Sequence, residues 1–471
     1  MARAGGTDQP RFDRRERLAL AAAGLAALVV ELDWMVVIIA LPRIADDLHR
    51  SPTDLQWLIT AFALGFGGFM PVSGWVTDAF GRRRITIYGI GLFLVSSVLC
   101  AAAQTLPWLV AGRALQGVAG SFIVPGTVAM TSAHLTGRKR DAGLGTVLAC
   151  ASGGAAAAPF VGGLLVDQFG WRSVFLVTLP VGIAAMALIY YRVMPSNNPA
   201  AAARRPPLLN GACVVLGAVV LAVAADRGTA WGWSSPAILA CVSAGFALLA
   251  SFILLERDED RAMVSRRVYR DRQLRLLTVA GAASTIGFVI LISFSVLYLA
   301  DSLRLPTFLS GCVLLGFSVP NALSAYAVGR ASGRGNAYWL LALSLGLCAA
   351  GLAGLTVASF PAFYVLALCV CGIGTGMSGA LTNILGQRQV SAVEAGATAS
   401  MSHAVRSLAA AVATSLAATT LESLHHGVSG AATDARGIDT VLRSTALLPV
   451  LALLLVLLTT VGRRPSAATP R

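Results

Sequence analysis

Long apolar runs separated by short polar segments repeat along the whole chain. Each run is roughly 17 to 25 residues long, the length that a helix needs to cross the hydrocarbon core of a bilayer. The pattern therefore predicts fourteen membrane-spanning helices. They are expected at residues 18–41, 55–76, 85–103, 106–130, 143–166, 173–189, 208–224, 237–255, 276–300, 308–328, 339–358, 362–385, 395–421 and 446–461.

The composition also favours a membrane protein over a soluble one. The 471 residues are 56% hydrophobic and 12% charged, whereas soluble domains carry about 25% charged residues. A transmembrane β-barrel would show alternating segments of about ten residues, and the apolar runs here are continuous. The expected fold class is an all-α polytopic membrane protein embedded in the lipid bilayer.

Basic residues are distributed unequally between the two sides of the predicted bundle. When successive loops are assigned to alternate sides, 27 of the 36 basic residues fall on one side and seven on the other, and Arg113 and Arg406 lie within spans. Loops rich in arginine and lysine remain in the cytoplasm. We therefore expect both termini in the cytoplasm and the chain in the cell membrane.

Two longer cytoplasmic connections divide the spans into groups of six, two and six. One, residues 191–207, contains several prolines and a run of alanines, and the other, residues 256–275, is strongly charged. The expected organisation is an N-terminal six-helix bundle over 1–190, two extra central helices with their linkers over 191–275, and a C-terminal six-helix bundle over 276–471.

Several functional classes are disfavoured. The arginines are scattered over short loops, which argues against a nucleic-acid surface. The eight cysteines all lie in apolar runs and lack zinc-ligand spacing, so no metal site is expected. The only lysine, Lys139, follows Arg138, so the chain lacks the Gly-Lys-Ser/Thr of a P-loop. An ion gradient is then the remaining internal source of energy, and no cofactor is expected.

Ionisable residues inside spans are costly and point to function. Glu31 and Asp33 lie in the first span and Arg113 in the fourth. Asp33 and Arg113 both lie roughly 10–12 Å below the outer surface, so we expect them to pair in one state. A neutral carboxylic acid is far less costly to bury than a carboxylate, so Asp33 could load and release a proton. A purely structural ion pair is the alternative.

Glu31 lies roughly 200° round the helix from Asp33 and should face elsewhere, as a second proton or cation site or against a polar neighbour. His403 and Arg406 share one face of span 13, where a packing role is the alternative for the histidine. Together with aromatic side chains, they could line a substrate cavity between the two halves near the midplane. The aromatic candidates are Trp34, Phe66, Phe69, Phe288, Phe294 and Tyr298.

The most specific pattern is the polar stretch GWVTDAFGRRR between spans 2 and 3. It resembles the pattern G-x-x-x-D-x-x-G-R-[KR]-[KR] in the loop between helices 2 and 3 of the major facilitator superfamily. The resemblance implies the major facilitator fold and a cytoplasmic charge lock between the halves, with two glycines that permit close helix approach. The matching residues are Gly74, Asp78, Gly81, Arg82, Arg83 and Arg84.

Three further stretches resemble the fourteen-helix drug:proton antiporters (EmrB/QacA type) of that superfamily. Span 1 carries LDWMVVIIALP around Asp33, although Met35 and Ile38 replace the usual Thr and Asn. Span 4 carries RALQGVAGS, and the resemblance implies proton transfer for Arg113. Span 5 matches an antiporter signature that marks exporters, with Ala158 in place of one Gly. Its matching residues are Gly145, Gly154, Pro159, Gly162 and Gly163.

Together these features predict proton-coupled export of lipophilic, often cationic, drugs or antibiotics by alternating access, carried out by a monomer. A secondary carrier for a metabolite or a lipid-like compound is the alternative. A membrane-embedded transferase is a more remote one, because no H-E-x-x-H or G-x-S-x-G motif stands out in the sequence.

Overall fold

A computed structural model describes residues 11–50, 52–194, 208–257, 270–299, 305, 307–331, 337–357, 361–390, 395–425 and 445–457. The first six spans are α1 (Arg14–Leu48), α2 (Pro52–Phe80), α3 (Arg82–Ala101), α4 (Leu106–His134), α5 (Gly137–Phe169) and the consecutive helices α6 (Ser173–Leu176) and α7 (Thr178–Arg192). The central pair is α9 (Leu208–Trp231) and α10 (Pro236–Leu255). The last six are α12 (Arg272–Leu297), α13 (Thr307–Ala331), α14 (Ala337–Thr356), α15 (Pro361–Gln389), α16 (Ala395–His425) and a terminal helix, Thr445–Leu457.

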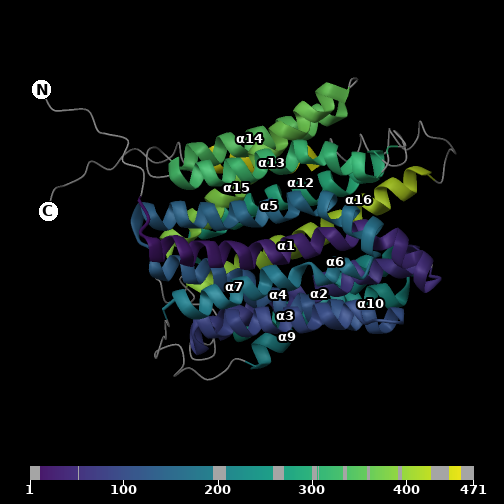
Figure 1. The fold of residues 1–471 in the computed structure, drawn as a ribbon. Coiled ribbons are helices and arrows are strands. Elements are labelled where there is room, and N and C mark those ends of the chain that lie inside the picture. The colour runs from purple at the N-terminus through teal and green to yellow at the C-terminus, as the bar shows by residue number, and fades with distance from the viewer. Residues whose placement is uncertain are drawn as a thin grey trace, which may run out of the picture.

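The described helices run side by side along one direction (Figure 1). Eleven of those in the described ranges are long and apolar enough to cross a membrane, and two shorter apolar segments, Leu209–Leu221 and Thr445–Leu457, join them. With α16, and with α6 and α7 taken as one span, the count is fourteen, which confirms the predicted fold class. The predicted domain boundaries near residues 190 and 275 stay predictions.

The two six-helix halves meet along two seams. In one, α5 packs against α13, and in the other α2 packs against α16. The central helices α9 and α10 pack on each other, and α9 also contacts both helices of the second seam. An apolar cluster that includes Cys213 of α9, Trp75 of α2 and Ala397 of α16 fills this junction. The additional pair therefore lies beside the seam between α2 and α16.

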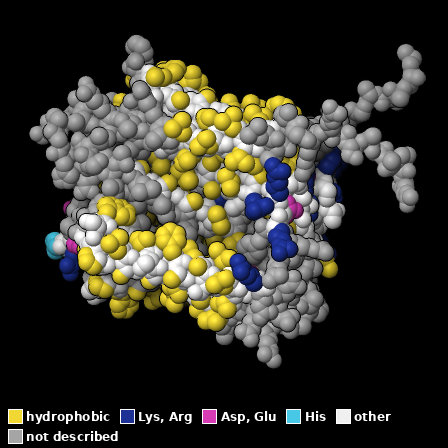
Figure 2. All heavy atoms as spheres, turned by 180° about the vertical axis from the view of Figure 1, so that it is seen from behind, with side chains coloured by type: hydrophobic (Ala, Val, Ile, Leu, Met, Phe, Trp, Pro, Cys, Tyr) yellow, Lys and Arg dark blue, Asp and Glu magenta, His cyan; other side chains and the backbone are white. Residues whose placement is uncertain are grey.

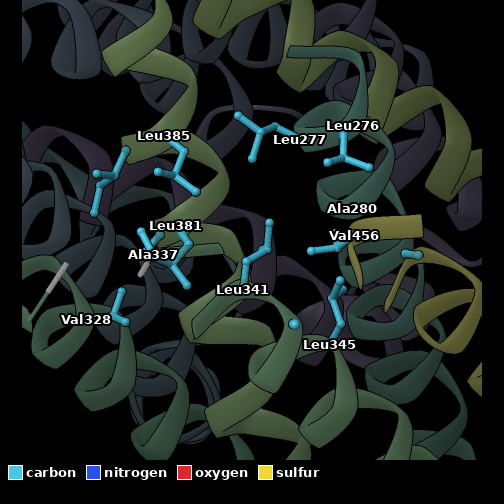
Figure 3. Close-up of a cluster of buried hydrophobic side chains, with 14 of the residues drawn as sticks. Leu276, Leu277, Ala280, Val328, Ala337, Leu341, Leu345, Leu381, Leu385 and Val456 are labelled. Carbon is cyan, nitrogen blue, oxygen red and sulfur yellow. The ribbon is translucent and has the colours of Figure 1, made fainter. Parts of the chain in front are cut away.

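The largest apolar core lies in the C-terminal half and also includes Val128 of α4 and Leu144 of α5. In the C-terminal half, leucine and alanine side chains of α12, α14 and α15 converge with Val456 of the terminal helix (Figure 3). On the outer surface visible in Figure 2, hydrophobic side chains cover much of the described middle, while arginine and lysine gather toward one end. We call that end, at which α1 begins and which carries Arg83, Lys139, Arg330 and Arg388, the basic end.

Candidate functional site

Asp33 of α1 and Arg113 of α4 form an ion pair inside the N-terminal half. The Nη1 of Arg113 lies 2.5 Å from the Oδ2 of Asp33. Asp33 is fully buried and Arg113 is 1% exposed. The structure thus brings together two charges that were expected to pair because they lie at the same depth in the membrane.

Both carboxylate oxygens of Asp33 accept hydrogen bonds. The Nε2 of Gln116 donates to Oδ1 at 3.1 Å, and the Oε1 of Gln116 accepts from Arg113 Nη1 at 2.9 Å. Gln116 Nε2 also donates to the hydroxyl of Ser97 on α3, which accepts from Thr178 on α7 as well. Four helices therefore contribute to one buried polar network, and such networks are strongest when every member has a partner.

The guanidinium of Arg113 is also fixed by α2. Its Nε donates to the carbonyl of Leu58 at 3.3 Å, and its Cζ lies 4.4 Å from the centre of the Phe62 ring. Phe62 stacks on Phe66 at 5.9 Å and meets Trp34 edge-on at 4.9 Å. An aromatic cluster that includes two predicted cavity residues is thus in direct contact with the charge pair.

Glu31 lies on a different face of α1 from Asp33. On that side of the helix, Leu28 touches Gly154 of α5, and Trp34 meets the aromatic rings of α2. Glu31 lies between these two contacts and is half-buried. Among the described residues it has no ion-pair or hydrogen-bond partner, so its carboxyl group is available to a ligand or a proton.

The end of α2 contacts the other half at the basic end, and the predicted loop is almost entirely helical, because only Gly81 separates α2 from α3. Asp78 accepts a hydrogen bond of 3.0 Å from the backbone N–H of Ala397, in the first turn of α16. A carboxylate at a helix N-terminus is favoured by the unpaired N–H groups and by the helix dipole. Asp78 also pairs with Arg82 of its own half at 3.0 Å. The bond across the seam therefore joins a carboxylate to a helix end and not one side-chain charge to another.

The other residues of the motif lie in α2, at Gly81 between the helices, and in the first turn of α3. Gly74 allows α2 to touch α16, because a Cβ there would lie 1.9 Å from Ser400 Oγ and 2.8 Å from Ala397 Cα. Gly81 has a φ of 98°, a conformation that favours glycine. Arg83 donates to the carbonyl of Tyr190 within its own half, and Arg84 is exposed.

The predicted antiporter signature occupies the contact faces of α5. A Cβ at Gly145 would lie 2.6 Å from the Cα of Gly329 on α13. Further along, Pro159 packs against Gly311 of α13, while Gly154 and Gly162 pack against α1. Gly163 is half-buried. Small residues thus permit α5 to pack closely against both α1 and the opposite half.

One ion pair between the halves, which joins α5 to α15, was not predicted from the sequence. Arg388, at the end of α15, lies 2.5 Å from Asp141 near the start of α5, and the aspartate is almost fully buried. Both residues lie close to loops, where charged side chains ordinarily set the orientation of the chain in the membrane, so the sequence does not mark them as a pair. The pair joins the two halves at the basic end.

The remaining predicted cavity residues are dispersed. Phe69 is half-buried, Phe288 stacks on Phe317, and Tyr298 stacks on Tyr364. The side chain of Phe294 lies outside the described residues. His403 and Arg406 lie on α16, and the arginine contacts Thr285 of α12.

Two six-helix halves that meet along two seams, with an ion pair buried inside one of them, define a polytopic membrane transporter. The chain belongs to the Major Facilitator Superfamily, whose family model matches residues 23–414.

Relatives include drug-resistance proteins. Multidrug resistance protein Stp of Mycobacterium tuberculosis is 30% identical over 78% of this chain and 68% of its own length. Puromycin resistance protein pur8 of Streptomyces alboniger is 32% identical over 87% of this chain and 83% of its own. Putative multidrug resistance protein MdtD of Escherichia coli is 31% identical over 71% of each.

A solved structure has the same fold. The human organic anion transporter MFSD10 (TETRAN) matches with a TM-score of 0.69 over 94% of this chain and 99% of that one. The two sequences are 13% identical, so the likeness shows the fold alone.

Proposed function

We propose that the chain exports lipophilic, often cationic, drugs or antibiotics in exchange for protons, by alternating access between its two halves. The observation that carries the proposal is the fully buried pair of Asp33 and Arg113. The names of the relatives, multidrug resistance and puromycin resistance proteins, support the class of substrate.

Proton coupling follows because a proton and Arg113 compete for the carboxylate of Asp33. A proton on the carboxylate would neutralise the charge that Arg113 pairs with, and Arg113 would lose its strongest partner. Because the guanidinium is also held by the Leu58 carbonyl and the Phe62 ring of α2, its release would change the contacts between α1, α2 and α4. In the conformer described here the carboxylate is out of reach of solvent, so proton exchange would need another conformer.

The contacts at the basic end support alternating access. Asp78 with Ala397, Gly74 with Ser400, and Asp141 with Arg388 join the halves there. This conformer would then face away from the basic end. We propose that the basic end lies in the cytoplasm of the cell, with both termini on that side, as the positive-inside rule requires.

Glu31 would supply a carboxylate on the path of the substrate. It lies between the α5-facing and α2-facing sides of α1, near Trp34, and has no partner among the described residues. A carboxylate beside aromatic rings suits a lipophilic cation, and the same group could carry a second proton. A transport role of this kind needs no chemical step, and we propose a carrier and not an enzyme.

Growth and efflux measurements test this function. Cells that express the chain should tolerate higher concentrations of puromycin and of lipophilic cationic dyes than matched cells without it. An uncoupler that removes the proton gradient should stop the efflux of the dyes. Uptake of a metabolite without any change in drug tolerance would contradict the proposal and favour the alternative, a secondary carrier for a metabolite.

A further inference from the structure

Arg406 is a buried cation whose terminal amino groups have no partner among the residues that the structure describes. It is 9% exposed, and its Nε donates to the Oγ1 of Thr285 on α12 at 3.2 Å. That hydroxyl donates in turn to the carbonyl of Gly281 at 2.8 Å, so its oxygen is oriented to accept. Within the described ranges, Nη1 and Nη2 have neither a hydrogen bond nor an ion pair.

The membrane-spanning part of the C-terminal half supplies no counter-charge. Helices α12 to α15 contain no Asp or Glu, and α16 contains only Glu422. That residue lies roughly 24 Å along the helix from Arg406 at 1.5 Å per residue. A cation inside a membrane without a counter-ion is unfavourable, and such residues ordinarily face a partner or a cavity.

His403 adds a second polar group beside the arginine. Its Nε2 is buried and has no hydrogen-bond partner in the part of the chain that the structure describes. Ser400 and Ser407 mark the side of α16 that contacts α2, and Arg406 marks the side that contacts α12. His403 lies roughly 60° from Ser400 and roughly 60° from Arg406, so it faces the junction of the two halves.

We infer that Arg406 and His403 form a binding subsite for an anionic group on the transported compound, such as a carboxylate. The arginine fork donates two parallel hydrogen bonds to such a group, and the imidazole N–H can donate a third. Thr285 fixes the guanidinium by Nε and leaves the terminal amino groups to the ligand. The inference rests on the proposed export function and adds that, among its lipophilic substrates, compounds that carry an acid, zwitterions included, bind more tightly than matched compounds without one.

A matched pair of dyes tests the subsite. Rhodamine B carries a free carboxyl group that rhodamine B ethyl ester lacks, and binding of each to the purified full-length protein can be measured by fluorescence anisotropy. The wild type should bind the acid more tightly by about tenfold or more, the scale of one charge-assisted hydrogen bond. Arg406→Gln should remove this preference by weakening binding of the acid more than binding of the ester.

Arg406→Lys is the matched control because it keeps the cation but loses the fork, and it should retain part of the preference. His403→Phe should lower binding of the acid alone. Monodisperse elution of each variant shows that it is folded. Equal affinity of the wild type for the two dyes, no binding of either, or an unchanged preference in Arg406→Gln overturns the inference.

Failure of the subsite can be told apart from failure of the proposed function. If proton-driven export of the ester persists without any preference for the acid, the subsite is wrong and the exporter stands. If the acid is preferred in binding but neither dye is exported on a proton gradient, the proposed function is wrong and the subsite stands.

Discussion

Arg113 Nη1 lies 2.5 Å from Asp33 Oδ2, and the two residues, 80 positions apart in the chain, meet where α1 crosses α4. The same Nη1 donates to Gln116, and the ring of Phe62 lies against the guanidinium. With the carbonyl of Leu58, which accepts from its Nε, the arginine thus has three contacts in addition to its charge partner. The ion pair and the ring contact can each be tested by substitution.

Removing the arginine charge should destabilise the protein. Arg113→Met would leave the Asp33 carboxylate buried without its counter-charge, a change that costs about 3–5 kcal/mol in comparable cases. Thermal unfolding of the purified variant should therefore show a markedly lower Tm. Arg84→Met, at an exposed position in the first turn of α3, should leave Tm unchanged. Equal Tm values for the two variants would mean that the pair contributes little to stability.

Removing the ring beneath the arginine should weaken the pair and leave its charge intact. Phe62→Leu removes a cation–π contact worth about 2 kcal/mol when desolvated, together with two ring contacts. We expect lower efflux and a lower Tm. Phe69→Leu is the matched control, because Phe69 lies on the same helix and has no ring contact in the described ranges. A larger loss in the control would contradict the role given to Phe62.

Enlarging Gly74 should open the basic end. In Gly74→Ala the new methyl group would clash with the backbone of Ala397, which cannot rotate away as the Ser400 hydroxyl can. In a chain whose native cysteines are replaced, Thr398→Cys, at a buried position of α16, should then react faster with a polar maleimide. Gly91→Ala, at a position with open space, should leave the rate unchanged.

Exchanging the charges of the ion pair at the basic end should restore function. Asp141→Arg and Arg388→Asp should each reduce efflux, since each places like charges at the seam between α5 and α15. The double variant should recover at least part of the activity, and a double-mutant cycle measures the coupling of the two sites. Additive losses in the double variant would show that the contact between Asp141 and Arg388 does not join the halves.

Much of the fold could be predicted because the bilayer fixes helix length and loop charge. Two of the expected spans, 208–224 and 395–421, correspond to α9 and α16, and both lie at the seam with α2. Counting residues from the outer ends of the two spans also predicted that Asp33 and Arg113 lie at the same depth, because both helices rise by the same amount per residue.

The rest of the site depends on which face each helix turns inward and on backbone groups. A single sequence predicts neither. Ser97 and Thr178 are ordinary hydroxyl residues until α3 turns Ser97 toward Gln116 and α7 turns Thr178 toward Ser97. The Ala397 N–H is a partner for Asp78 only because α16 begins there. Phe62 could not be told from Phe66 and Phe69 in the same run, because only the packed helices show which ring meets Arg113.

The most direct test of proton coupling is a proton flux measured in everted membrane vesicles. Addition of rhodamine B ethyl ester to vesicles with an imposed proton gradient should dissipate that gradient in the wild type. In Asp33→Asn, which keeps the shape and loses the titratable group, the gradient should remain, although binding of the dye should stay within about threefold of the wild type. A proton response in Asp33→Asn as large as that of the wild type would contradict the assignment of coupling to this carboxyl group.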